Sequence, residues 1–133
     1  MSTPFIFIAT HKIKPGKGEA FKQYFAHFSS DVVEPAEPRL HCFYGYTAPD
    51  SDYVTVVQVH PDADSMRTHM KVGLEHFATA YAEYLEAETS LQIYGNLTQD
   101  LIRAISAAAQ TDGGDSNVTI RQPFAGFDRL PAS

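Results

Sequence analysis

The sequence of 133 residues contains no tryptophan, a single cysteine and no long apolar run. One cysteine cannot form an internal disulfide, and Cys42 lies in a run typical of a strand, where a buried thiol is the usual role. No segment approaches the roughly 20 apolar residues that a membrane-spanning helix needs. The first residues also lack the basic start and small-residue cleavage site of a signal peptide. We therefore expect a cytoplasmic protein with no membrane partner.

Basic residues are also scarce. Ten Lys and Arg stand against 16 Asp and Glu, which gives a formal net charge of −6. Because no basic cluster interrupts this acidic balance, nucleic acid is not an expected partner. The six histidines show no HxH or HExxH spacing, and the chain has neither a glycine-rich phosphate loop nor a serine-hydrolase elbow. The sequence thus predicts neither a metal nor another bound cofactor.

What the chain does contain is a regular alternation of strand-like and helix-like segments. Apolar periodicity and turn residues predict a strand, a helix and a loop, then a hairpin, a long helix and a last strand. Their approximate ranges are 5–13, 17–29, 31–38, 40–47 with 53–60, 62–87 and 89–94. This βαββαβ order predicts an α+β, ferredoxin-like fold with an antiparallel four-stranded sheet and both helices on one face.

We expect this ferredoxin-like domain to occupy residues 1–96. Residues 97–133 are predicted to form a C-terminal helix over 97–109, a flexible polar linker over 111–117 and an extended tail. The tail includes Phe124 and Phe127, which are apolar enough to need burial. We therefore expect it to pack on the domain or on a partner subunit.

The two central strands are apolar on both sides. Helices on one face would leave the other face of the strands over 5–8 and 54–59 uncovered. A second copy of the same sheet would cover that face through a twofold interface. A homodimer is therefore the expected state.

The segment over 62–87 is the first place to look for a ligand site. Its periodicity predicts an apolar stripe made by Leu74, Phe77, Ala78, Tyr81 and Leu85. His69 and His76 would lie two turns apart on one face if Gly73 does not break the helix. Either histidine alone is more often a hydrogen-bonded structural residue than a catalyst.

Two stretches of the chain resemble a known family. The opening IFIATHKIKPGKGEAFKQYF includes the turn Lys14-Pro15-Gly16, and the block VVQVHPDADSMRTHMKVGLEHFATAYAEYL includes His69 and the pair His76-Phe77. Over roughly 5–94 these features resemble the antibiotic biosynthesis monooxygenase-like family of the dimeric α+β barrel superfamily. Two departures stand out: Val59-His60 replaces a Trp-Glu-like pair, and the absence of tryptophan argues against the haem-degrading branch.

The resemblance implies a cofactor-independent monooxygenase that binds a small phenol or quinol-like molecule, removes a proton and lets the anion react with oxygen. His76 is the expected base, because neutral imidazole has the proton affinity needed near neutral pH. His69 would be a second base or would orient the substrate. The expected substrate-binding residues are Tyr44, Tyr46, Phe77 and Tyr81. Two alternatives remain open: a noncatalytic small-molecule-binding dimer that uses the same pocket, and a structural dimer with incidental histidines.

Overall fold

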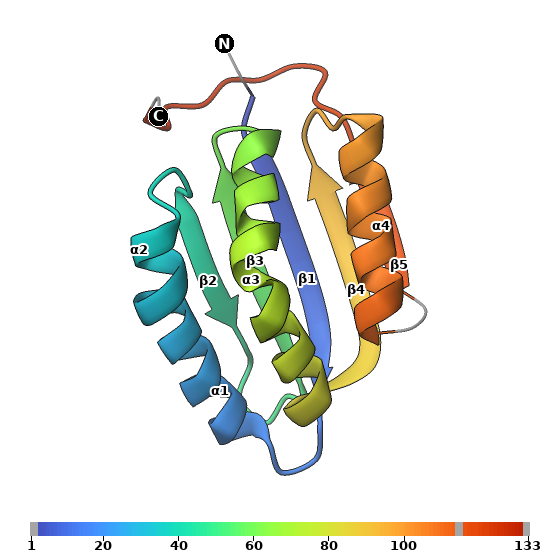
Figure 1. Ribbon diagram of the computed structural model, residues 1–133. Helices are drawn as coiled ribbons and strands as arrows, with labels where there is room; N and C mark the ends of the chain where they lie inside the picture. Colours follow the sequence, from blue (N-terminus) through green and yellow to red (C-terminus); the bar gives the residue numbers. More distant parts are fainter. Residues whose placement is uncertain (1–2, 114–115, 132–133) are drawn as a thin grey trace.

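The computed structural model describes residues 3–113 and 116–131, and its strands form one twisted sheet (Figure 1). The sheet order is β2-β3-β1-β4-β5, with β1 in the centre. β1 pairs antiparallel with β3 through contacts such as Ile8 with Val57, and antiparallel with β4 through contacts such as Ala9 with Leu91. The strands are β1 Phe5–Ile13, β2 Cys42–Tyr46, β3 Tyr53–His60, β4 Leu85–Tyr94 and β5 Ser116–Arg121.

The predicted four-stranded antiparallel sheet was wrong in its strand number and in its purely antiparallel pairing. β5 joins the edge of the sheet parallel to β4, so the sheet is mixed. Parallel neighbours need a crossover connection, and α4, Gln99–Gly113, lies between the two strands in the chain. Leu101 and Ile105 of α4 are buried in the same cluster as Phe5 and Phe7. The extended tail predicted after residue 117 therefore contributes residues 118–121 to a strand of the main sheet.

The helices cover one face of the sheet (Figure 1). α1, Gly18–His27, continues without a break into the π-helix η1, Phe28–Val33, and the short α2, Glu34–Ala36. The loop predicted over 31–38 was therefore wrong as far as Ala36. In η1 the turn is wider, and the Glu34 amide donates to the carbonyl of Ser29, five residues earlier. The helical path then continues through Pro35, which has no amide hydrogen to donate. The chain leaves the helix at Glu37, directly beside α3.

The long helix α3, Ala63–Glu83, begins at a side-chain cap, because Asp62 accepts a hydrogen bond of 3.1 Å from the Ser65 amide. Gly73 does not break the helix. The predicted apolar stripe was partly wrong: Leu74 is 68% exposed, Ala78 is exposed, and Leu85 belongs to β4. The residues of α3 that are buried against the sheet are Ser65, Met66, His69, Gly73 and Ala80.

Two apolar clusters lie between the sheet and the helices. The first joins β1, β4, α3 and α4, and the second joins the far end of β1 to α1, α3 and the start of β4. Among the residues that the structure describes, no helix has the length and apolar character needed to cross a bilayer. The two clusters border the same cavity, which holds the candidate site.

Candidate functional site

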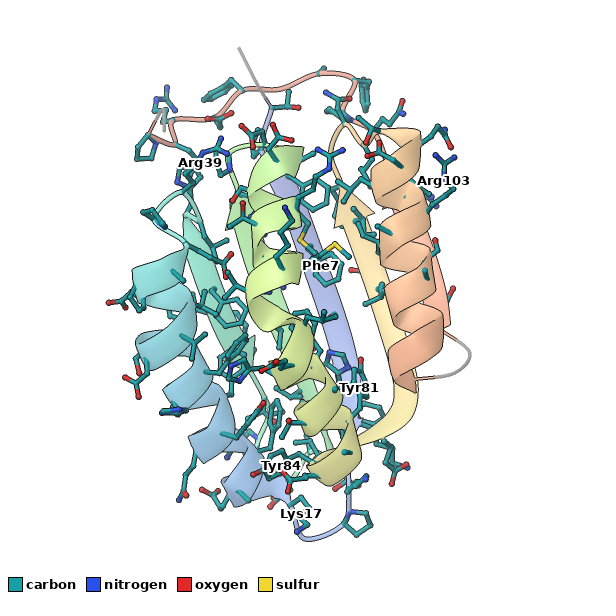
Figure 2. All side chains as sticks on the ribbon, in the orientation of Figure 1. Phe7, Lys17, Arg39, Tyr81, Tyr84 and Arg103 are labelled. Atoms are coloured by element: carbon teal, nitrogen blue, oxygen red, sulfur yellow. The ribbon has the colours of Figure 1, made fainter. Side chains whose placement is uncertain are left out.

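A cavity of about 130 Å³ lies between the sheet and helices α1 and α3. Phe7 of β1 and Tyr81 of α3 both line this cavity, and Figure 2 shows them at different heights of the sheet. An apolar cavity of about 150 Å³ in another protein binds benzene, so this one is large enough for a single aromatic ring. The aromatic and aliphatic side chains that line it include Phe21, Phe25, Phe28, Phe43, Val56, Met70, Phe77 and Leu91.

The main polar feature of the cavity wall is a buried pair formed by His69 and Glu37. His69 Nδ1 lies 2.9 Å from Glu37 Oε2 and 3.1 Å from Oε1, and both side chains are almost completely buried. A carboxylate can only accept, so the pair places the ring proton on Nδ1. Within residues 3–113 and 116–131, His69 Nε2 has no hydrogen-bond partner although it is buried.

This arrangement has the geometry of an oriented base. The carboxylate fixes the tautomer and the direction of the ring, and it stabilises the imidazolium that forms when the ring takes up a proton. The lone pair on Nε2 is then available to a ligand, because His69 lines the cavity. A buried polar atom without a partner is costly for the folded protein, which is why such atoms often belong to sites that bind something.

His76 also lines the cavity, in a different environment. Its ring is half-buried and packs on Phe28 with a centroid distance of 4.6 Å. The Tyr24 hydroxyl donates to the His76 carbonyl oxygen at 2.8 Å and lies 3.5 Å from Nδ1. Burial, followed by the nearby Tyr84, raises the pKa of Tyr24, so this hydroxyl keeps its proton near neutral pH. The structure therefore brings both predicted histidines to one cavity, but only His69 is paired with a carboxylate.

A second polar chain lies close to His69. His60 Nε2 is 2.9 Å from Gln58 Oε1 and His60 Nδ1 is 2.7 Å from Ser65 Oγ. The rings of His60 and His69 are 6.0 Å apart. Burial, and after it the neighbouring His69, lowers the pKa of His60 to about 3, so this ring is neutral.

The predicted aromatic contacts divide into two groups. Phe77 and Tyr81 line the cavity, and the Tyr81 hydroxyl lies 3.0 Å from His11 Nδ1. Tyr44 and Tyr46 do not line the cavity of their own chain and are 60% and 55% exposed. Side chains alternate along a strand, and Phe43 of β2 packs against α1, so Tyr44 and Tyr46, one and three positions further on, face away from the helices.

Sequence reasoning missed Glu37 and Gln58. Glu37 lies in an acidic, proline-containing segment, and its pairing with His69 spans 32 positions of the chain, so no local pattern indicates it. Gln58 did give a signal. It is a polar residue at an inward position of the apolar run YVTVVQVH, and such a residue needs a buried partner.

Six histidines are potential metal ligands. Across the part of the chain that the structure describes, no three His, Cys, Asp or Glu side chains come together in a way that could hold a metal ion. Of the histidines that line the cavity, His69 contacts Glu37, whereas His76 and His11 contact the hydroxyls of Tyr24 and Tyr81. Their described contacts are those of a hydrogen-bonded site.

A mixed sheet with its helices on one face, and an aromatic cavity between them, defines an α+β fold of the antibiotic biosynthesis monooxygenase-like type. No protein-family model matches the sequence, and no curated protein matches it either. Solved structures do match. MupZ from Pseudomonas fluorescens aligns with a TM-score of 0.68 at 15% identity, over 97% of this chain and 98% of that chain.

Two further structures align with the larger part of the chain. A candidate antibiotic biosynthesis monooxygenase from Nitrosomonas europaea has a TM-score of 0.61 at 20% identity, over 74% of this chain and 95% of its own. PA3566 from Pseudomonas aeruginosa has a TM-score of 0.60 at 21% identity, over 74% and 98%. At these identities the likeness shows the fold. The match to MupZ takes in 97% of the chain and so includes α4 and β5.

Proposed function

We propose that the protein is a cofactor-independent monooxygenase that oxidises a small phenol or quinol-like aromatic in the cavity between the sheet and the helices. The observation that carries this proposal is His69 Nε2, which is buried at an aromatic-lined cavity and backed by Glu37. The cavity volume suits one aromatic ring. The fold likeness to a candidate monooxygenase supports the reaction class.

The reaction begins with a proton transfer. His69 Nε2 accepts the phenolic proton, and Glu37 stabilises the imidazolium that results. The phenolate then reacts with dioxygen: a carbon–oxygen bond forms at the ring carbon para to the phenolate, and uptake of a proton gives a hydroperoxide. The O–O bond breaks while that carbon loses its hydrogen as a proton, which leaves a quinone carbonyl and releases water. One phenol and one dioxygen thus give one quinone and one water, and no external reductant is needed.

In this scheme the order of the two predicted bases is reversed. His69 has the oriented, spare nitrogen, whereas His76 contacts Tyr24 and the face of Phe28. His76, Phe77 and Tyr81 are assigned to the walls of the cavity, where they position the ring and exclude water. A dry, apolar wall strengthens the electrostatic effect of Glu37 on His69.

Oxygen uptake with a panel of single-ring phenols and hydroquinones tests the proposal. We expect consumption of dioxygen to match formation of a quinone, measured by its absorbance. His69→Gln should lower the rate about 10²- to 10⁴-fold, the usual contribution of a general base. Leu74→Ala, on the exposed side of the same helix, is the matched control and should leave the rate unchanged. An unaltered rate in His69→Gln would remove this residue from the mechanism.

The noncatalytic alternative has one observation in its favour: nearly all of the cavity wall is apolar, which is also typical of a site that only holds a ligand. Calorimetry with the same panel separates the two functions. Saturable binding of a phenol under air, with no oxygen consumed and the phenol recovered intact, would identify a binding protein.

The open face of the sheet supports a homodimer as part of the proposal. Tyr44, Tyr46 and Tyr53 are roughly half exposed there, and Ile8 and Val57 face the same side. A second copy would bury these side chains through a twofold contact. Light scattering should give twice the chain mass for the wild type and for Leu74→Lys, and the monomer mass for Val57→Lys. A dilute, stable wild-type monomer would contradict the dimer.

A further inference from the structure

Gln58 is the second polar group at the end of the cavity where His69 lies. It lines the cavity and is 4% exposed, and its Oε1 is held 2.9 Å from His60 Nε2. His60 and Ser65, which complete the chain of hydrogen bonds, are buried as well. Phe43, which pairs with Gln58 across β2 and β3, has its ring 5.3 Å from that of His69, and the His60 ring is 6.0 Å from it, so Gln58 and the candidate base share both neighbours.

The hydrogen-bond chemistry of this chain fixes the direction of each bond. An amide oxygen can only accept, so His60 Nε2 carries the proton and donates to Gln58 Oε1. His60 Nδ1 is then an acceptor, and the Ser65 hydroxyl donates to it at 2.7 Å. Burial lowers the pKa of His60 to about 3, which agrees with a neutral ring that has one donor and one acceptor.

The end of the amide that His60 does not use is the amino group of Gln58, which can only donate. His69, with its proton on Nδ1 toward Glu37, offers only the acceptor Nε2. One end of the cavity therefore presents an acceptor and a donor within the same small space. A phenolic hydroxyl has the complementary chemistry: it gives up a proton, and its oxygen then accepts hydrogen bonds.

We propose that the Gln58 amino group is the hydrogen-bond donor that holds the ligand's phenolate oxygen, while His60 and Ser65 are positioning residues that fix the direction of the amide. This inference rests on the proposed phenol site and adds to it the group that stabilises the anion. A donor to an anion in a dry cavity is stronger than in water, so Gln58 would favour proton transfer to His69 as well as binding.

The test uses 4-nitrophenol, whose anion absorbs visible light and whose neutral form does not. The full chain is titrated with it under nitrogen at a series of pH values, so the measurement needs no turnover. Gln58→Met keeps the length and removes the donor. We expect the bound nitrophenol to lose its proton at a higher pH in this variant, with the anion bound about 10- to 100-fold more weakly than in the wild type.

Two further variants separate positioning from packing. Ser65→Ala removes the partner of His60 Nδ1 without touching the cap, because the bond to Asp62 uses the Ser65 backbone. We expect a smaller rise in the apparent pKa of the bound nitrophenol, between those of the wild type and Gln58→Met. Thr68→Ala removes an exposed hydroxyl on the same helix and should change nothing. If Gln58→Met does not fold, a higher apparent pKa of the bound nitrophenol in Ser65→Ala than in Thr68→Ala supports the inference, and equal values contradict it.

The other outcomes overturn the inference in distinguishable ways. An unchanged apparent pKa of the bound nitrophenol in Gln58→Met would mean that Gln58 does not contact the oxygen, although the phenol site itself would stand. A lowered apparent pKa would mean that the amide presents its oxygen to the ligand. No binding to the wild type would remove both this assignment and the proposed site.

Discussion

His69 and His76 lie on the same helix and border the same cavity, but their surroundings differ. His69 is fully buried, with Nδ1 on Glu37 and Nε2 without a partner among the described residues. His76 is half-buried between aromatic rings, and the Tyr24 hydroxyl lies 3.5 Å from its Nδ1. Their spacing along α3 makes the two histidines look equivalent in the sequence. The residues packed against them make them different. A base needs an orienting partner as well as an imidazole, and only one of the two has a carboxylate.

The strongest way to break this comparison is to remove the carboxylate and leave both rings in place. Glu37→Gln keeps the shape of the side chain but allows the amide to donate to His69 Nδ1, which would favour the tautomer with its proton on Nε2. We expect the rate of oxygen uptake to fall at least about 100-fold, since loss of the orienting carboxylate in the serine proteases costs about 10⁴-fold.

The matched control is Glu34→Gln, an exposed glutamate one turn earlier in α2. It makes the same chemical change without a partner in the cavity and should leave the rate within about twofold of the wild type. His76→Gln changes the cavity wall and should lower the rate less than Glu37→Gln does. A large loss in His76→Gln with little change in Glu37→Gln would reverse the assignment of the two histidines.

The buried histidines His60 and His11 determine part of the protein's stability in acid. Burial lowers the pKa of His60 to about 3 and that of His11 to about 4, both from 6.5. Between each lowered pKa and 6.5, the unfolded chain binds a proton that the folded chain does not. The free energy of unfolding therefore falls as the pH drops below about 6.5. Each histidine contributes up to about 1.4 kcal/mol per pH unit.

Urea unfolding at several pH values between 7 and 4 measures this slope. His60→Gln keeps two hydrogen-bonding atoms and removes the titration, so its stability should fall less steeply with pH than that of the wild type. Thr68→Ala replaces an exposed residue that carries no titratable group and serves as the control, with a slope like that of the wild type. Equal slopes in the wild type and His60→Gln would mean that His60 is not held neutral in the fold.

Apolar periodicity and turn residues were enough to predict strands β1 to β4 and the two main helices, although β4 begins at Leu85, earlier than the predicted position 89. These patterns did not predict that β5 pairs parallel with β4, because this pairing depends on the helix between the two strands and not on the six residues of β5. The alternation in β2 was visible, but only the packing of Phe43 on Phe25 decides which face is inside and moves Tyr44 and Tyr46 away from the cavity. The pair of Glu37 and His69 depends on the π-helical turn that brings residue 37 beneath α3.

The smallest expected effect concerns Gly73, which lies between the two histidines on α3. A Cβ placed there would lie 2.5 Å from Cζ of the Phe77 ring, which also lines the cavity. In Gly73→Ala, the gain in helix propensity, about 1 kcal/mol, is offset by the displacement of this ring. We expect the free energy of unfolding to change by less than about 1 kcal/mol, while nitrophenol binds several-fold more weakly because the ring is pushed from its place in the cavity wall.

Gly18→Ala at the start of α1, where a Cβ meets no atom within 4 Å, is the control and should leave binding unchanged. Unchanged binding in Gly73→Ala would show that the Phe77 ring is not part of the ligand's surface, although this ring lies 5.7 Å from that of His69.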